Sequence, residues 1–158
     1  MKITTVNLRT LLPSLFLVAA VGGAGAVITA MGMDAYQLLK LPPLVPPGWV
    51  FGVVWTVLYL LMGYASYLVK SASCFEKESA LQAYYVQLAL NFLWVVTFFR
   101  FGQLWLSVVV LVLLIAAILL TAYRFSRCSV TAARLLIPYL IWCGFALYLN
   151  IGIAVLNR

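Results

Sequence analysis

Five long stretches without a charged residue divide this chain, and they limit what it can fold into. The stretches are 10–33, 41–69, 79–99, 101–123 and 135–157. Each is at least as long as the roughly 20 residues that a helix needs to cross the hydrocarbon core of a bilayer. None alternates apolar and polar residues as a barrel strand does. The chain is therefore expected to be an all-α integral membrane protein, a bundle of five transmembrane helices.

The composition excludes several classes of protein. Hydrophobic residues make up 66% of the 158 and charged residues 8%, whereas soluble domains are about 45–50% apolar and about 25% charged. A soluble enzyme, a disordered chain and a nucleic-acid-binding domain are excluded. The net charge of +7 comes from cations at the ends of apolar runs, which is typical of anchoring at a membrane surface.

The residues that bind metals are scarce. The chain has no histidine, so an imidazole metal site, an axial haem histidine and a histidine general base are excluded. Cys74, Cys128 and Cys143 are scattered without a C-x-x-C pair, and they predict neither a disulfide framework nor a zinc site. No metal site and no required cofactor are expected.

Helix boundaries follow from charges and prolines. The proline pairs at 42–43 and 46–47 disfavour helix, so the second helix is expected to begin near Trp49, after an ordered loop at 34–48 that could include a short helix at 35–39. The short links between the other helices predict antiparallel neighbours and one domain over residues 1–158. The expected helices are 8–33, 49–70, 80–99, 103–124 and 131–156.

The first stretch allows two interpretations. Residues 24–26 (Ala-Gly-Ala) resemble a signal-peptidase site, but the apolar run continues to Met33 and favours a spanning helix. Gly22 and Ala26 have the spacing of close helix contacts, either within the chain or in a dimer. Seven cations lie on the N-terminal side of the membrane and three on the other side, so the N-terminus is expected in the cytoplasm if the membrane is an inner one. The seven are Lys2, Arg9, Lys70, Lys77, Arg124, Arg127 and Arg134.

Polar and aromatic residues form stripes on three expected helices. Gln87, Asn91, Trp94 and Phe98 share one face of the third helix. The second helix has Phe51, Trp55, Tyr59 and Gly63 at intervals of four, and the fifth has Pro138, Trp142, Ala146 and Asn150. Amides at membrane depth should face the bundle interior, because unpaired amides are costly in hydrocarbon. Such stripes are typical either of packing or of a cavity for a flat, mostly apolar ligand with polar edges.

Three motifs resemble one known family. They are Pro46-Pro47-Gly48-Trp49-Val50-Phe51-Gly52-Val53-Val54-Trp55 continuing to Tyr67, Gln87-Leu88-Ala89-Leu90-Asn91 with Trp94 and Phe98-Phe99, and Ala132-Ala133-Arg134-Leu135-Leu136-Ile137-Pro138-Tyr139 continuing through Trp142 to Asn150. In this order and spacing they are similar to the translocator protein family (TspO/MBR), whose bacterial members are tryptophan-rich sensory proteins. The resemblance extends from about Tyr36 to Asn150.

The resemblance implies a five-helix bundle that binds porphyrins such as protoporphyrin IX and haem, and isoquinoline or benzodiazepine drugs, in a pocket covered by the first loop. Sterol-like lipids and a second copy of the chain are further partners that it implies. Carried over by motif, the pocket includes Tyr36, Trp49, Trp55, Tyr59, Asn91, Trp94, Trp142, Phe145 and Ala146. The stripes add Gln87, Phe98 and Asn150.

The chain departs from the family pattern in its first loop. Ala35 and Leu44 stand where the family has tryptophans, and Ile151 breaks the cholesterol-recognition pattern, which is weak by itself. The first hypothesis is a receptor or carrier for tetrapyrroles, with Gln87, Asn91 or Asn150 at the polar edges and Lys40 near the propionates.

Three other functions stay open. Some bacterial relatives are associated with light-dependent porphyrin breakdown, for which Trp55 and Trp142 would be the candidates, although conventional catalysis is not expected. A membrane scaffold is the second. An ion-coupled transporter is disfavoured, because no charge lies at membrane depth.

Overall fold

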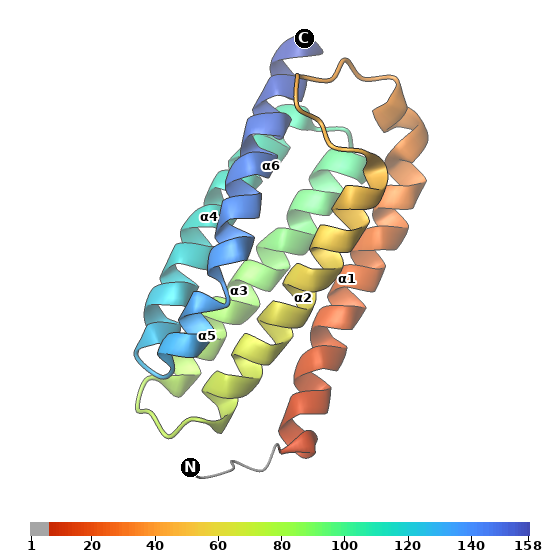
Figure 1. The fold of residues 1–158 in the computed structure, drawn as a ribbon. Helices are drawn as coiled ribbons and strands as arrows, with labels where there is room; N and C mark the ends of the chain where they lie inside the picture. Colours follow the sequence, from red (N-terminus) through yellow and green to blue (C-terminus); the bar gives the residue numbers. More distant parts are fainter. Residues whose placement is uncertain (1–6) are drawn as a thin grey trace.

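Helices account for the whole architecture of residues 7–158, the part of the chain that this computed structural model describes (Figure 1). Five helical segments are long and apolar enough to cross a membrane, which confirms the predicted all-α membrane bundle. No strand occurs within residues 7–158. The elements are α1 (Leu8–Gln37), α2 (Gly48–Ser71), α3 (Lys77–Val95), the π-helical turn η1 (Val96–Arg100), α4 (Leu104–Ser126), α5 (Val130–Arg134) and α6 (Ile137–Leu156).

Three helix ends differ from the sequence-based expectation. The helix α1 continues to Gln37 without a separate helix at 35–39, because nothing before Pro42 interrupts it. The third span ends in the π-turn η1 instead of a regular α-helical turn. The fifth span is divided into α5 and α6 at residues 135–136, since Pro138 lacks an amide donor and disfavours helix just before it.

The helices form a closed ring with one weak seam. The helix α1 packs against α2 on one side and against α3 and η1 on the other, α3 packs against α4, and α4 packs against α6. Between α2 and the fifth span, the substantial contact is made by the short helix α5. The α2–α6 boundary beyond α5 is therefore the least closely packed wall of the bundle.

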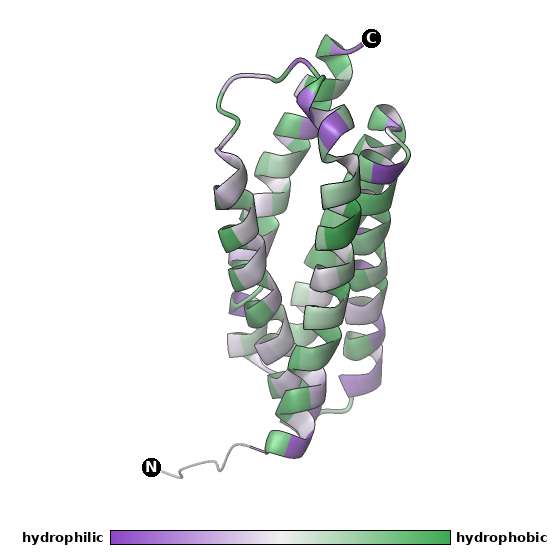
Figure 2. Ribbon diagram, turned by 90° about the vertical axis from the view of Figure 1, so that its right-hand side faces the viewer, coloured by the Kyte–Doolittle hydropathy of each residue, from purple (hydrophilic) through white to green (hydrophobic). Residues whose placement is uncertain are grey.

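Strongly hydrophilic residues gather mainly toward the two ends of the bundle (Figure 2).

The α1–α2 loop, residues 38–47, lies on the C-terminal end of α6. The Asn157 side chain accepts a hydrogen bond from the Lys40 amide and donates one to the Lys40 carbonyl, both at 2.9 Å. Tyr148 Oη donates to the Pro43 carbonyl at 3.0 Å. A Cβ on Gly152 would lie 2.7 Å from Pro42 Cβ, so only glycine allows this close approach. The loop is thus held over one end of the seam.

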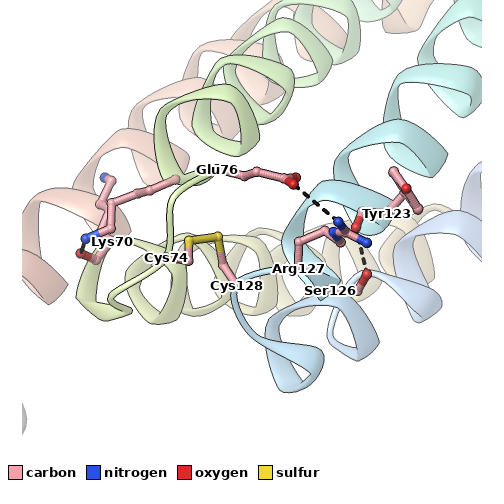
Figure 3. Close-up of a disulfide and its surroundings, with 8 residues drawn as sticks. Lys70, Cys74, Glu76, Tyr123, Ser126, Arg127 and Cys128 are labelled. Atoms are coloured by element: carbon pink, nitrogen blue, oxygen red, sulfur yellow. Dashed lines mark hydrogen bonds and ion pairs between the residues drawn. A yellow bond between two sulfur atoms is a disulfide. The ribbon is translucent and has the colours of Figure 1, made fainter.

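A disulfide joins the α2–α3 and α4–α5 links at the other end (Figure 3). It connects Cys74 to Cys128, with Cα atoms 5.3 Å apart. The prediction that the cysteines form no disulfide was wrong for this pair. Their sequence separation of 54 residues hid the contact, which the antiparallel helices bring about in space. Cys143 is free and buried.

Candidate ligand-binding site

A buried hydrogen-bond network ties α2, α3 and α6 together at membrane depth. Tyr139 Oη of α6 donates to Gln87 Oε1 at 2.9 Å and accepts from Asn91 Nδ2 at 3.0 Å. Tyr59 Oη of α2 donates to Asn91 Oδ1 at 2.6 Å. Gln87 Nε2 contacts Met62 Sδ at 3.8 Å. Gln87, Asn91 and Tyr139 are each at most 1% exposed, so the network replaces water for these polar groups.

A second buried network lies closer to the loop end. Trp94 Nε1 donates to Asn150 Oδ1 at 2.9 Å, and Asn150 Nδ2 donates to Ser107 Oγ at 3.0 Å and to the Leu104 carbonyl at 3.3 Å. This network joins α3, α6 and α4. The amides expected to face the interior do so, and their hydrogen-bonding groups are bound to other side chains or to backbone.

Aromatic rings surround the first network. The Trp55 ring lies 5.9 Å from Trp94, 5.7 Å from Tyr59 and 6.1 Å from Tyr139, measured between centroids. The Trp94 ring continues this cluster to Phe98 at 6.3 Å. Trp55 and Tyr59 are half-buried, whereas Trp94 and Phe98 are buried. The rings from α2 are therefore partly accessible, whereas the rings from α3 and η1 are not.

A groove of about 410 Å³ lies in the α2–α6 seam. Apolar side chains line it almost completely: Val53, Val54, Val57, Leu58, Pro138, Ile141 and Trp142. Val53, Val57 and Ile141 are exposed in the free chain, which places the groove mouth on the surface that faces lipid. The Phe51 ring packs edge-on against Trp142 at 5.6 Å.

The indole nitrogen of Trp142 is the one unsatisfied polar atom in this wall. Among residues 7–158, Trp142 Nε1 is the only buried side-chain nitrogen or oxygen without a hydrogen-bond partner. Buried donors in proteins are nearly always paired. The Trp142 residue lines the groove while its Nε1 atom is buried, so a ligand acceptor could satisfy this donor only if the indole ring shifts.

A smaller hollow of about 250 Å³ lies between the end of α1, η1 and the start of α4. Tyr36 lines it and packs against Phe98 and Phe99, with ring centroids 6.1 and 5.8 Å apart. Gly32 is required there, because a Cβ would clash with the Phe99 carbonyl oxygen. Tyr36 therefore lies beside this second hollow and not in the α2–α6 groove.

The expected site residues fall into separate places. The structure brings Trp55, Tyr59, Gln87, Asn91, Trp94, Phe98 and Asn150 into the networks and the ring cluster, and puts Trp142 in the groove. Phe145 packs beside Trp142 at 5.5 Å, and Ala146 is buried one turn beyond Trp142. Trp49 is 71% exposed at the start of α2, away from all of these.

Sequence reasoning missed Tyr139, Ser107 and Met62, the partners of the amides. For Tyr139 a signal existed: residues 139, 143, 146 and 150 have the same helical spacing as the stripe on the third helix. The groove residues on α2 carry no such signal, because the valines and leucines that line the groove continue without a break into those that face lipid.

Comparison with known proteins places the chain in a family. The model of the TspO/MBR family matches residues 14–156. The tryptophan-rich protein TspO of Archaeoglobus fulgidus is 35% identical over 155 residues, covering 96% of this chain and 99% of the relative. The tryptophan-rich protein TspO of Chlorobaculum tepidum is 38% identical over 154 residues, covering 96% of this chain and 98% of the relative.

A eukaryotic relative gives the same result. The translocator protein of Homo sapiens is 42% identical over 122 residues, covering 75% of this chain and 72% of the relative. With five membrane-spanning helices and a family match over most of its length, the chain is a multi-pass integral membrane protein that belongs to the TspO/MBR family.

Proposed function

We propose that this protein is a membrane receptor or carrier for flat, mostly apolar ligands of the tetrapyrrole class, such as protoporphyrin IX, and that these bind in the α2–α6 groove. The observation that carries the proposal is an apolar groove of about 410 Å³ whose wall includes Trp142, a residue with a buried and unpaired Nε1. Ligand sites typically have volumes of about 300–1,000 Å³, apolar walls and a few polar groups. The volume and the apolar walls of the groove agree with this description, and the unpaired Nε1 of Trp142 is the polar group closest to it.

The binding energy would come from two sources. Apolar surface of the ligand leaves water or lipid and packs against valine, leucine and indole surfaces. An acceptor atom of the ligand would also pair with Trp142 Nε1, and leaving a buried donor unpaired costs about 1–3 kcal/mol. A flat ligand that offers an acceptor at its edge therefore fits better than a featureless hydrocarbon.

The buried amides have a different role in this proposal from the one that their sequence pattern indicated. Gln87, Asn91 and Asn150 are already paired inside the protein, so a ligand could reach them only by breaking those bonds. We assign them to holding α3 and α6 rigid behind the groove. The polar edge of the ligand would be met by Trp142 and, for propionates near the loop, by the Lys40 ammonium group.

A fluorescence titration tests the proposal. Protein in lipid nanodiscs is titrated with protoporphyrin IX, and quenching of the tryptophan emission is followed to saturation. Trp142→Phe replaces the indole by a smaller aromatic ring without an N–H donor. It should raise the dissociation constant at least about 2- to 10-fold, the effect of losing a hydrogen bond of about 0.5–1.5 kcal/mol.

Trp105→Phe is the matched control. Trp105 is 48% exposed at the start of α4 and contacts Arg158 instead of the groove, so its loss should leave the dissociation constant unchanged. Absence of saturable quenching in the wild-type protein, or equal effects of the two substitutions, would contradict the proposal.

A further inference from the structure

The Cys74–Cys128 disulfide lies on the face of the bundle that carries most of the positive charge. Of the nine lysines and arginines within residues 7–158, six lie at this end and three at the loop end. The six are Arg9, Lys70, Lys77, Arg124, Arg127 and Arg134. The positive-inside rule directs such a face to the cytoplasm, where the thiol pool keeps most protein cysteines reduced.

The disulfide is placed where it can hold the groove together. Cys74 lies three residues after the end of α2 at Ser71, and Cys128 lies two residues before the start of α5 at Val130. The helices α2 and α5 pack against each other, and α5 leads directly into α6. The bond therefore fixes the end of the seam that lies opposite the α1–α2 loop.

The contacts that cross the seam directly are apolar or aromatic, such as Phe51 on Trp142 and Trp55 on Tyr139. Within residues 7–158, no side-chain hydrogen bond or ion pair connects α2 to α5 or α6. The neighbouring seam between α3 and α4 is different: Arg124 Nη1 donates to the Ser79 carbonyl at 2.9 Å, and Arg127 pairs with Glu76 at 3.5 Å (Figure 3). Opening the disulfide would leave these bonds in place and would leave α5 held to α2 by side-chain packing alone.

Both cysteines are open to small molecules. Each is partly exposed, and Phe75 beside Cys74 is fully exposed. Lys70, which donates to Ser14 Oγ, and Arg127, which pairs with Glu76, lie in the same region (Figure 3). The excess of cations at this end of the bundle attracts the anionic thiolate of a small thiol such as glutathione.

We propose that Cys74–Cys128 is a reversible thiol–disulfide exchange site that sets the width of the α2–α6 groove. A glutathione thiolate attacks one cysteine sulfur, the S–S bond breaks, and the other cysteine leaves as a thiolate that takes up a proton. A second glutathione thiolate attacks the mixed disulfide and releases glutathione disulfide. Two cysteine thiols remain, and two electrons have passed from glutathione to the protein. Glutathione disulfide drives the reverse reaction.

The test separates the chemistry of the bond from ligand binding. Cys143→Ala protein in nanodiscs has only two cysteines and keeps the bond, so a maleimide mass shift counts the opened pair directly in glutathione buffers of increasing reducing power. The pair is expected to open in a buffer poised as in the cytoplasm and to close again in oxidised glutathione. Amide hydrogen exchange at residues 130–134 should then rise at least tenfold, and exchange in α3 should stay unchanged.

The double variant Cys74→Ser/Cys128→Ser is the permanently open reference and should match the reduced protein in its exchange pattern. A pair that stays closed at cytoplasmic poise, or exchange at residues 130–134 that does not respond to opening, would overturn the proposal.

The effect on ligand affinity rests on the proposed function. It is measured by protoporphyrin IX titrations of the closed and open forms, with at least a threefold difference in dissociation constant expected. If the thiol count and hydrogen exchange respond while neither form binds protoporphyrin IX, the exchange site stands and the proposed function fails. Binding with equal affinity in both forms would overturn the control of groove width.

Discussion

Replacing Tyr139 by phenylalanine removes one hydroxyl group and leaves one atom on each of two amides without a partner. The hydroxyl donates to Gln87 Oε1 and accepts from Asn91 Nδ2, and Tyr139 is fully buried. The ring itself stays, so its packing against Trp55 is preserved. Any loss of stability then measures the two hydrogen bonds between α6 and α3.

The size of the loss follows from the number of bonds. Hydrogen bonds between membrane helices contribute on average about 0.6 and at most about 1.7 kcal/mol each, so two bonds predict a loss of about 1 to 3.5 kcal/mol. The upper half of this range is expected, because Gln87 Oε1 and Asn91 Nδ2 stay buried and unpaired. Tyr59→Phe breaks only the bond to Asn91 Oδ1 and should cost about half as much.

The assay is unfolding in mixed micelles titrated with SDS, followed by circular dichroism. Tyr123→Phe is the matched control, because Tyr123 is 62% exposed and surface substitutions usually change stability by less than about 0.5 kcal/mol. Gln87→Leu should lower the free energy of unfolding less in the Tyr139→Phe variant than in the wild-type protein. In that variant Gln87 Oε1 has already lost its hydrogen bond from Tyr139. The reasoning would be refuted if Tyr139→Phe lowered the free energy of unfolding no more than Tyr123→Phe. It would also be refuted if the effects of Tyr139→Phe and Gln87→Leu were additive.

Three further substitutions test other parts of the structure. Gly152→Ala places a Cβ against Pro42 and should release the loop, seen as faster proteolysis of residues 38–47 with unchanged helix content; a protected loop would contradict the contact. Trp94→Phe leaves Asn150 Oδ1 unpaired and should lower the free energy of unfolding by about 1 to 2 kcal/mol, whereas no change in SDS unfolding would contradict this. Cys128→Ser opens a loop of 54 residues and should lower stability under oxidising conditions by about 4 kcal/mol, with no difference from wild type once both are reduced.

Much of the fold follows from the position of the charges. Uncharged runs of about 20 residues or more that do not alternate apolar and polar residues are expected to be helices, because hydrocarbon offers no partner for free backbone groups. For the same reason the amides at 87, 91 and 150 were expected to face inward, and all three are buried. The proline pairs likewise placed the start of α2 to within one residue, since proline cannot continue a helix without losing a backbone bond.

The groove could not be predicted in this way. Its α2 wall consists of valines and leucines that have the same composition as the lipid-facing surface of the helix, so no pattern marks them. Whether they line a groove depends on how far α6 stands from α2, and that distance depends on packing between elements that are far apart in the chain. The partners of the amides could not be assigned for a related reason. The spacing of Tyr139 indicates which face of the helix it shares, but not which amide on another helix it will bind.

The sequence alone determined the membrane class, the five helical spans and the inward direction of the amides, because these depend on the cost of exposing polar groups to hydrocarbon, residue by residue. Only the tertiary structure decided that the amides are hydrogen-bonded inside the protein, that Trp142 Nε1 has no partner, and that Cys74 forms a disulfide with Cys128. These features depend on distances between helices that are far apart in the chain, and packing of the whole bundle sets those distances.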